Sequence, residues 1–169
     1  MIEDYIREVP DFPKPGIMFK DITPLLQEPQ AMKEAVRQLH QQIPEGIIHK
    51  VVGIESRGFI FGPLLADMLG AGFVPVRKPG KLPYKKYSTS YQLEYGTDTL
   101  EIHQDAIRKG ENVLIHDDLL ATGGTAQAAC KLVELVGGKV VQMSFLLELS
   151  YLRGRDKLTR QEVSALIVY

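Results

Sequence analysis

The chain has 169 residues, a length that suits one domain with a hydrophobic core. Its hydrophobic fraction of 44% and charged fraction of 24% are typical of globular proteins, and a net charge of −1 argues against a general nucleic-acid-binding role. The single cysteine, Cys130, excludes an internal disulfide and a multi-cysteine zinc site. No signal peptide or membrane-spanning apolar run is apparent, so we expect a cytoplasmic protein with no membrane partner.

Strand and helix signals alternate along the chain, which predicts an α/β fold with a parallel sheet. The predicted elements, in chain order, are a helix at 30–42, a strand at 51–54, a helix at 58–69, a strand at 73–76, strands at 97–102 and 113–116, a helix at 125–136, and strands at 140–147 and 164–168. Pro75 indicates an edge or irregular position for its strand. Residues 79–96 fit no buried element, and we expect a long functional loop there.

The most specific signal lies in residues 113–125. An apolar run predicts a buried strand that carries two adjacent carboxylates, Asp117 and Asp118, to its end. The sequence Thr-Gly-Gly-Thr at 122–125 then opens a helix, whose N–H groups and small residues suit a bound phosphate. The carboxylates suit ribose hydroxyls or a divalent cation. The segment lacks the dinucleotide and P-loop fingerprints, so it predicts a sugar-phosphate site; the alternative is a merely structural connection.

A second strand-to-helix turn, Glu55-Ser56-Arg57-Gly58, occupies the corresponding position one unit earlier. Ligands of open α/β sheets collect at the carboxyl ends of the strands, so the two turns are expected to converge on one ligand. The N–H groups of 56–58 and the Arg57 guanidinium suit a pyrophosphate. The alternative is a helix start with a solvated arginine.

Residues 117–125 resemble the phosphoribosyl-diphosphate-binding motif of type I phosphoribosyltransferases, in the variant found in members of that family that use adenine. Blocks at 12–16, 19–26, 55–59, 77–83 and 93–96 are similar to the same family in the same order. The resemblance implies one domain over 1–169, with an open, mainly parallel sheet flanked by helices. It also implies a small N-terminal hood within 1–30 and a flexible catalytic loop at 79–96.

The activity that this resemblance implies is transfer of the 5-phosphoribosyl group from 5-phospho-α-D-ribose 1-diphosphate to adenine, giving AMP and diphosphate in purine salvage. It further implies a homodimer, and Mg²⁺ that is carried mainly by the diphosphate substrate rather than by protein side chains. Two alternatives stay open: a transferase for hypoxanthine–guanine or orotate, and a non-catalytic regulator that senses the same ligand.

The resemblance also implies roles for individual residues. Asp117 and Asp118 would hold the ribose hydroxyls, and the catalytic acid or base for the purine would be Glu94, beside Tyr95 in the loop. The 5-phosphate would lie on Ala121, Thr122, Gly123, Gly124 and Thr125. The diphosphate would contact Ser56, Arg57 and Gly58, in a loop where a cis peptide is common in the family, and also the basic residues Arg77, Lys78 and Lys81.

Three parts of the sequence allow more than one interpretation of their residues. Adenine would face the backbone near Met18 and the side chain of Lys20, where many relatives carry arginine; an ordered arm is the alternative. The basic residues from Arg77 onward could instead form a solvated face. His116 replaces the β-branched residue usual before the aspartates, and we expect a structural histidine with its hydrogen bonds satisfied.

Overall fold

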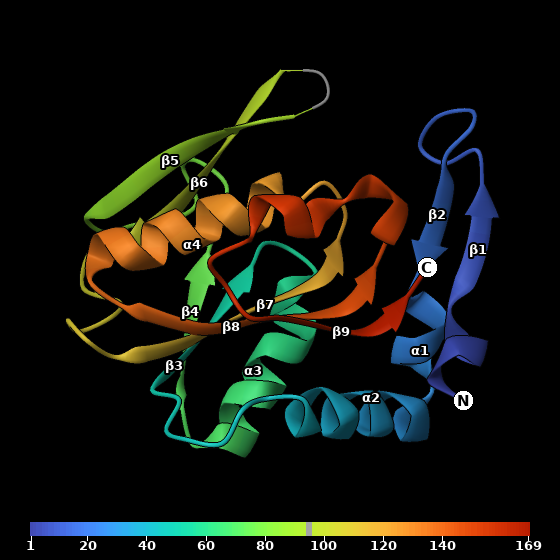
Figure 1. The fold of residues 1–169 in the computed structure, drawn as a ribbon, viewed down its shortest axis with the longest axis horizontal. Coiled ribbons are helices and arrows are strands. Elements are labelled where there is room, and N and C mark those ends of the chain that lie inside the picture. Colours follow the sequence, from blue (N-terminus) through green and yellow to red (C-terminus); the bar gives the residue numbers. More distant parts are fainter. Residues whose placement is uncertain (94–95) are drawn as a thin grey trace. The chain divides into compact units, whose positions relative to one another are not determined.

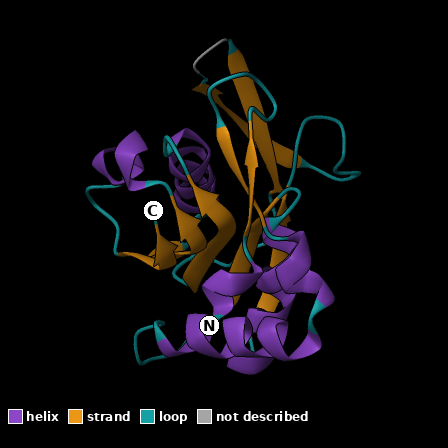
Figure 2. Cartoon of the chain, turned by 90° about the vertical axis from the view of Figure 1, so that its right-hand side faces the viewer, coloured by secondary structure: helices purple, strands orange, loops and turns teal. Residues whose placement is uncertain are grey.

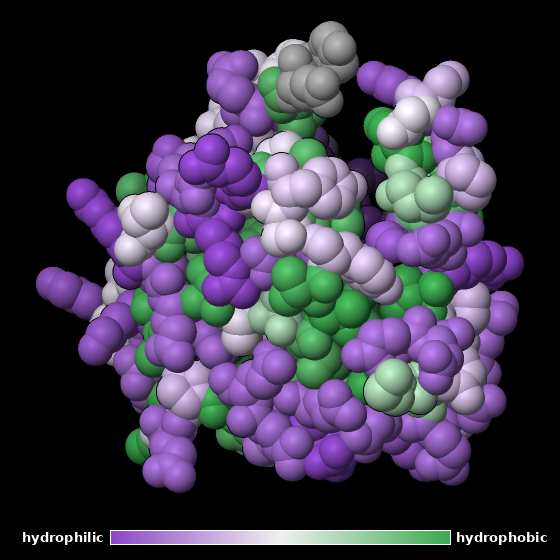
Figure 3. All heavy atoms as spheres, turned by 45° about the vertical axis from the view of Figure 1, so that its right-hand side comes forward, coloured by the Kyte–Doolittle hydropathy of each residue, from purple (hydrophilic) through white to green (hydrophobic). Residues whose placement is uncertain are grey.

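The computed structural model describes residues 1–93 and 96–169. It divides into two compact units, Met1–Gln38 and Leu39–Tyr169, and each is described by itself. Within the described residues, no helix combines the length and the apolar character needed to cross a bilayer. Hydrophilic side chains cover much of the face drawn in Figure 3, with hydrophobic ones exposed among them.

The N-terminal unit begins with a 3-10 helix, η1 (Ile2–Tyr5), followed by an antiparallel hairpin. The hairpin pairs β1 (Arg7–Pro10) with β2 (Met18–Asp21), and Glu8 lies opposite Lys20. Helix α1 (Thr23–Gln27) follows, and α2 (Pro29–Gln41) carries the chain into the second unit. The predicted helix at 30–42 is thus confirmed to within one residue at each end.

The second unit is built on a five-stranded sheet in which every neighbouring pair of strands is parallel, in the order β4-β3-β7-β8-β9. The predicted open, mainly parallel sheet is therefore confirmed (Figure 1). Strand β4 lies at one edge of the sheet, as Pro75 indicated. Proline has no backbone N–H to donate to a neighbouring strand, so it is tolerated at an edge. The strands are β3 (Lys50–Ile54), β4 (Gly72–Val76), β7 (Asn112–Leu120), β8 (Lys139–Glu148) and β9 (Val163–Val168).

Two helices connect the parallel strands and cover opposite faces of the sheet (Figures 1 and 2). Helix α3 (Gly58–Leu69) joins β3 to β4, and α4 (Gly124–Val136) joins β7 to β8. Val113 and Ile115 of β7 pack in the cluster beneath α4, whereas His116 meets Phe61 of α3. Successive side chains of a strand point to opposite faces, so this alternation places one helix on each side.

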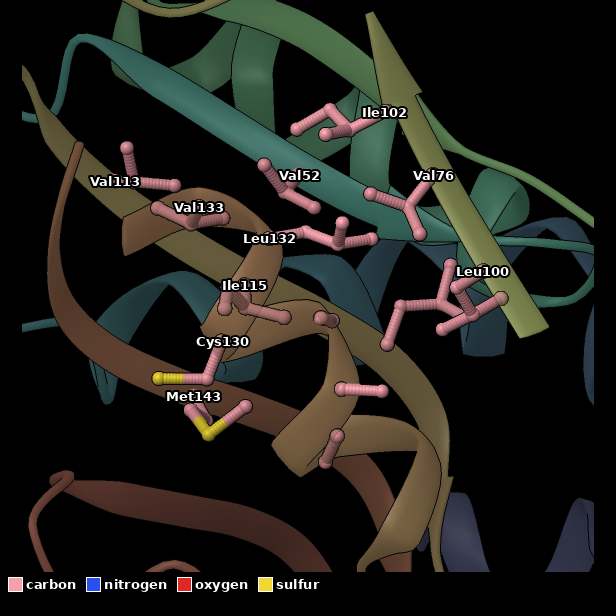
Figure 4. Close-up of a cluster of buried hydrophobic side chains, with 14 of the residues drawn as sticks. Val52, Val76, Leu100, Ile102, Val113, Ile115, Cys130, Leu132, Val133 and Met143 are labelled. Atoms are coloured by element: carbon pink, nitrogen blue, oxygen red, sulfur yellow. The ribbon is translucent and has the colours of Figure 1, made fainter. Parts of the chain in front are cut away.

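The main hydrophobic core lies between α4 and the sheet (Figure 4). Leu132 and Val133 of α4 are fully buried against Val52 and Ile115 of the central strands. Such buried side chains each contribute roughly 1.5–3 kcal/mol by leaving water. The core therefore fixes the position of α4, whose first turn carries part of the predicted phosphate site.

An antiparallel hairpin, β5 (Lys86–Gln92) with β6 (Thr97–His103), projects from this unit (Figures 1 and 2). The structure differs here from the loop expected at 79–96. Strand β5 is mostly exposed and rich in Ser, Thr and Tyr, so it lacks the apolar run that marks a buried strand, yet it has good β-forming residues. The backbones of Arg77 and Glu101 exchange two hydrogen bonds, of 3.0 and 2.8 Å, which join the hairpin to the chain just after β4.

Strand β7 continues to Leu120, beyond the predicted strand at 113–116. It stays paired with β8 through Asp117 opposite Phe145 and Leu120 opposite Glu148. Backbone pairing therefore continues past the end of the apolar run, and both aspartates lie within the strand instead of following it. The remaining elements are two 3-10 helices after β8, η2 (Ser150–Leu152) and η3 (Gly154–Lys157).

His116 is fully buried and packs edge-on against Phe61, with 6.3 Å between the ring centroids. Neither ring nitrogen makes a hydrogen bond of normal geometry with the described residues. The expectation of a structural histidine agrees with this burial, but in place of the expected full hydrogen bonding the ring has an interaction with the Ser144 backbone, which partly opposes the effect of burial on its pKa. Burial disfavours the charged imidazolium and lowers the pKa of His116 to about 3.

Truncating the core beneath α4 should cost much more than truncating its outer face. We expect Leu132→Ala to lower the free energy of unfolding by about 2–5 kcal/mol, because it leaves a cavity in the fully buried cluster. Leu135→Ala, on the same helix but 57% exposed, should change it by less than about 0.5 kcal/mol. Urea titration of both variants measures the difference, and equal losses would contradict the described packing.

Burial of His116 should make stability depend on pH. The pKa of this histidine is about 3 when folded, against 6.5 for an ordinary histidine, so below pH 6.5 the unfolded chain binds the extra proton. Stability is therefore fully present above that pH and is lost as the pH falls toward 3. Between about pH 7.5 and about pH 5, wild type should lose roughly 2 kcal/mol more than His116→Leu in urea unfolding. The partly exposed His40→Gln is the control and should behave as wild type.

Candidate active site

The turn between β7 and α4 encloses a small cavity of about 70 Å³. Gly123 adopts φ +81°, a left-handed conformation that favours glycine, and its carbonyl accepts the first helical bond from Gln127 N–H, at 2.9 Å. The N-terminus of α4 supplies N–H groups and the positive end of its dipole at this point. The residues that line the cavity are Asp117, Leu119, Leu120, Ala121, Thr122, Gly123, Thr125 and Ala126.

The two carboxylates of β7 lie next to each other in different surroundings. Asp117 lines the cavity and is partly exposed, whereas Asp118 is buried and forms an ion pair with Arg57, with 2.9 Å between Oδ2 and Nε. The backbone N–H of Asp118 donates to Oδ1 of Asp117 at 2.9 Å. Desolvation raises the pKa of both carboxyls; the neighbouring negative charge adds to this at Asp117, while the Arg57 guanidinium opposes it at Asp118.

The turn at 55–58 lies directly against the end of β7, as the sequence predicted. A Cβ on Gly58 would come within 2.9 Å of the His116 carbonyl oxygen and 3.1 Å of Asp117 Oδ1, so a larger residue has no room there. The Glu55–Ser56 peptide bond is cis, as the family resemblance led us to expect. Ser56 is exposed, and Arg57 is partly exposed although it is paired with Asp118.

Arg77 and Lys78 are held close to this turn by Glu55, a residue whose role was not predicted. Glu55 Oε2 accepts from Arg77 Nε at 3.2 Å and from the Lys78 backbone N–H at 2.9 Å. Burial alone would raise the pKa of Glu55, but these hydrogen bonds lower it. The Arg77 guanidinium also lies 6.0 Å from the ring centroid of Phe59.

The side chain of Lys78 is paired with the hairpin. Its ammonium group contacts Asp98 and lies 3.2 Å from the Tyr91 hydroxyl, which itself donates to Asp98. Burial alone would lower the pKa of Lys78, but these partners raise it. Lys81, four residues after Arg77, is exposed. Glu55, Asp98 and Tyr91 were missed because an ion pair between distant segments has no local sequence signal.

The hairpin also touches the first turn of α4. A Cβ on Gly124 would lie 3.3 Å from the Gln92 carbonyl oxygen and 3.4 Å from the Tyr91 ring. The predicted phosphate residues, the Arg57 turn and the basic residues 77 and 78 are thus gathered at one end of the sheet. The structure brings together the groups that the sequence assigned to ribose, phosphate and diphosphate.

The remaining predicted residues lie in the N-terminal unit or outside the residues that the structure describes. Glu94 and Tyr95, predicted as the catalytic residue and its neighbour, lie outside the described residues. Met18 is 40% exposed on β2, and Lys20 is ion-paired with Glu8 in the same hairpin. Both belong to the N-terminal unit, so their roles toward adenine stay predictions.

Comparisons with known proteins cover nearly all of the chain. The model of a family described as phosphoribosyl transferase domain matches residues 20–163. The adenine phosphoribosyltransferase of Christiangramia forsetii is 59% identical over 168 residues, which cover 99% of this chain and 98% of that protein.

Solved structures agree with this match. The adenine phosphoribosyltransferase of Thermoanaerobacter pseudethanolicus has a TM-score of 0.97 at 52% identity, with 99% of this chain and 98% of that one covered. That of Saccharomyces cerevisiae, in complex with adenine and an imino-altritol bisphosphate, has a TM-score of 0.93 at 43% identity, with 98% and 96% covered. With its fold and these matches in agreement, the chain belongs to the phosphoribosyltransferase family.

Proposed function

We propose that this chain transfers the 5-phosphoribosyl group of 5-phospho-α-D-ribose 1-diphosphate to adenine, releasing AMP and diphosphate. The observation that carries the proposal is the meeting of two turns at one end of the sheet. One follows the carboxylate pair of β7 and lines the cavity of about 70 Å³, and the other holds Arg57. Two relatives that are more than half identical to this chain over nearly their whole length are named adenine phosphoribosyltransferase. Their names favour adenine as the acceptor over hypoxanthine, guanine or orotate.

The ribose 5-phosphate binds at the β7–α4 turn. Its phosphate lies in the cavity against the N–H groups and hydroxyls of residues 121–125, at the positive end of the α4 dipole. Asp117 and Asp118 accept hydrogen bonds from the ribose hydroxyls. The Arg57 guanidinium offsets part of the cost that burial imposes on a negative charge at Asp118, and so helps this carboxylate to act as an acceptor.

The diphosphate binds across the turn at 55–58, with Ser56, Arg57 and Gly58 beneath it. Negative charge grows on the leaving diphosphate as its bond to the anomeric carbon breaks, and fixed cations stabilise that charge. Arg77 and Lys78 stand beside this turn with carboxylate partners, and Lys81 is exposed a few residues farther along. The diphosphate competes with Glu55 and Asp98 for these cations when it binds.

Mg²⁺ accompanies the diphosphate in this proposal. Within the described part of the chain, no three His, Cys, Asp or Glu side chains are grouped so as to hold a metal ion. Mg²⁺ usually binds one or two carboxylates together with substrate phosphates and water, so the pair Asp117 and Asp118 fits such an ion. When bound, Mg²⁺ neutralises part of the charge on the departing diphosphate.

Adenine is handled by the loop and the N-terminal unit. Glu94, beside Tyr95, exchanges a proton with a purine nitrogen as the new bond to the anomeric carbon forms. The backbone near Met18 and the side chain of Lys20 form part of a hood, within residues 1–30, over the base. The resemblance of residues 93–96 and of the blocks at 12–16 and 19–26 to the family supports both assignments.

We also propose a cytoplasmic homodimer. Leu64 and Met68, four residues apart on α3, are 36% and 47% exposed and share one helix face. Exposed apolar side chains in such a row are suited to burial against a second copy of the chain. The lone cysteine, which permits no internal disulfide, is in keeping with a reducing compartment.

The base specificity tests the proposed function directly. Purified protein with 5-phospho-α-D-ribose 1-diphosphate and Mg²⁺ should form AMP from adenine, and should turn over hypoxanthine, guanine and orotate at least about 100-fold more slowly, because polar groups built for one base reject another. Chelating the Mg²⁺ with EDTA should stop the reaction, and adding it back should restore it. Absence of turnover with adenine would overturn the proposal.

Glu94→Gln should separate catalysis from binding. Loss of the ionisable group should lower kcat by about 10²–10⁴-fold, as is typical of general acid–base catalysis, while the Kd for AMP in calorimetry stays within a few-fold. Glu45→Gln, at an exposed glutamate, is the control and should leave kcat unchanged. Unchanged kcat in Glu94→Gln would remove this residue from the mechanism, whereas retained binding with lost turnover counts against a non-catalytic regulator.

A further inference from the structure

Two glycines bring the chain after β8 into direct backbone contact with residues 121–125, the proposed phosphate loop. A Cβ on Gly123 would lie 2.4 Å from the Gly154 carbonyl oxygen, and a Cβ on Gly154 would lie 2.3 Å from the Ala121 carbonyl oxygen. Both distances are far below van der Waals contact, and both opposing atoms are backbone. Any side chain at either position would therefore push the two segments apart.

The segment that carries Gly154 is itself firmly anchored. Arg155 Nε donates to Glu148 Oε1 at 2.8 Å and its Nη2 donates to Oε2 at 2.7 Å, while Nη1 donates to the Val163 carbonyl at 2.9 Å. Glu148 is only 4% exposed. Charge-assisted, forked hydrogen bonds of this kind are both strong and directional. Arg155 thus ties η3 to β8 and to the start of β9.

Further bonds join the same segment to the loop on both sides of the glycine contact. On one side, the Leu149 N–H donates to the Leu120 carbonyl at 2.9 Å. On the other side, the Gln127 side-chain amide donates to the Lys157 carbonyl at 3.2 Å. The phosphate loop is therefore enclosed between β7, α4 and η3, although η3 supplies no residue to the lining of the cavity.

The loop needs support of this kind because its own residues are small and flexible. A cradle made of backbone N–H groups binds phosphate only while those groups keep their direction, and glycine restrains the backbone less than any other residue. Displacing a binding group by about 1 Å can cost on the order of 100-fold in rate. An anchored segment packed against the loop supplies the missing restraint.

We propose that η3 positions the phosphate loop: Gly154, held by the Arg155–Glu148 ion pair, sets the conformation of residues 121–123 and with it the affinity for the 5-phosphate of the substrate. Gly154, Arg155 and Glu148 are positioning residues, since none of them lines the cavity. This inference rests on the proposed function, in which the 5-phosphate occupies that cavity.

Gly154→Ala tests the contact itself. The added methyl group must displace the Ala121 carbonyl, so we expect the KM for 5-phospho-α-D-ribose 1-diphosphate to rise on the order of 10- to 100-fold, with the KM for adenine nearly unchanged. Gly72→Ala is the matched control, because its Cβ would meet only the flexible end of the Lys50 side chain, and its kinetics should equal those of wild type.

Arg155→Gln tests the anchor without adding bulk. Its side chain is about half exposed, so the variant is expected to fold, as thermal unfolding will show. Arg155→Gln should raise the KM for 5-phospho-α-D-ribose 1-diphosphate, by a smaller factor than Gly154→Ala does, and leave the KM for adenine nearly unchanged. Arg155→Lys should bring the raised KM part of the way back to the wild-type value. Equal rises in both KM values, or unchanged KM values in Gly154→Ala and Arg155→Gln, would overturn the proposal.

Hydrogen exchange separates this inference from the proposed function. In Gly154→Ala and Arg155→Gln, the backbone amides of residues 120–125 should exchange faster than in wild type, while those of the core strand β3 should exchange at the wild-type rate. Wild-type turnover of adenine is measured first, and its absence would count against the proposed function alone. Unchanged exchange at 120–125 in Gly154→Ala would overturn the positioning role, whatever the enzyme acts on.

Discussion

The contact between the start of α3 and the end of β7 is the constraint on which the site depends. Gly58 lets the turn at 55–58 come against the His116 carbonyl and Asp117, and this closeness places Arg57 within ion-pairing distance of Asp118. In the proposed function, one substrate then bridges a cation for its leaving group and acceptors for its sugar. A wider separation of the two strand–helix units would leave two half-sites on the same sheet.

Much of this arrangement could be predicted from the sequence because the central strands are buried on both faces. Val51 to Ile54 and Val113 to Ile115 are continuous apolar runs, and parallel strands necessarily bring their carboxyl ends to one edge. The polar strand β5 has no such run, so its pairing with β6 was not foreseen. Glu55, Asp98 and Gly154 gave no signal either, since their roles come from partners 20 or more residues away.

The cations of the site do not stand alone in this structure. Arg57, Arg77 and Lys78 are paired with Asp118, Glu55 and Asp98, respectively. Such pairs hold long side chains in place before a ligand arrives, which spares part of the entropy that ordering them would otherwise cost on binding. In the proposed function, the same pairs also lower the affinity for diphosphate, because the incoming diphosphate must replace the carboxylate partners of these cations. A transferase that must release diphosphate in every cycle gains from both effects.

The edge of the parallel sheet at β4 has a consequence outside catalysis. An exposed edge strand offers unpaired N–H and C=O groups on which another chain can add a strand, and aggregation begins readily at such edges. Pro75 removes one donor from β4, and the two backbone bonds between Arg77 and Glu101 occupy the chain just beyond it. The hairpin that reaches toward the phosphate loop thus also shields the sheet from unwanted self-association.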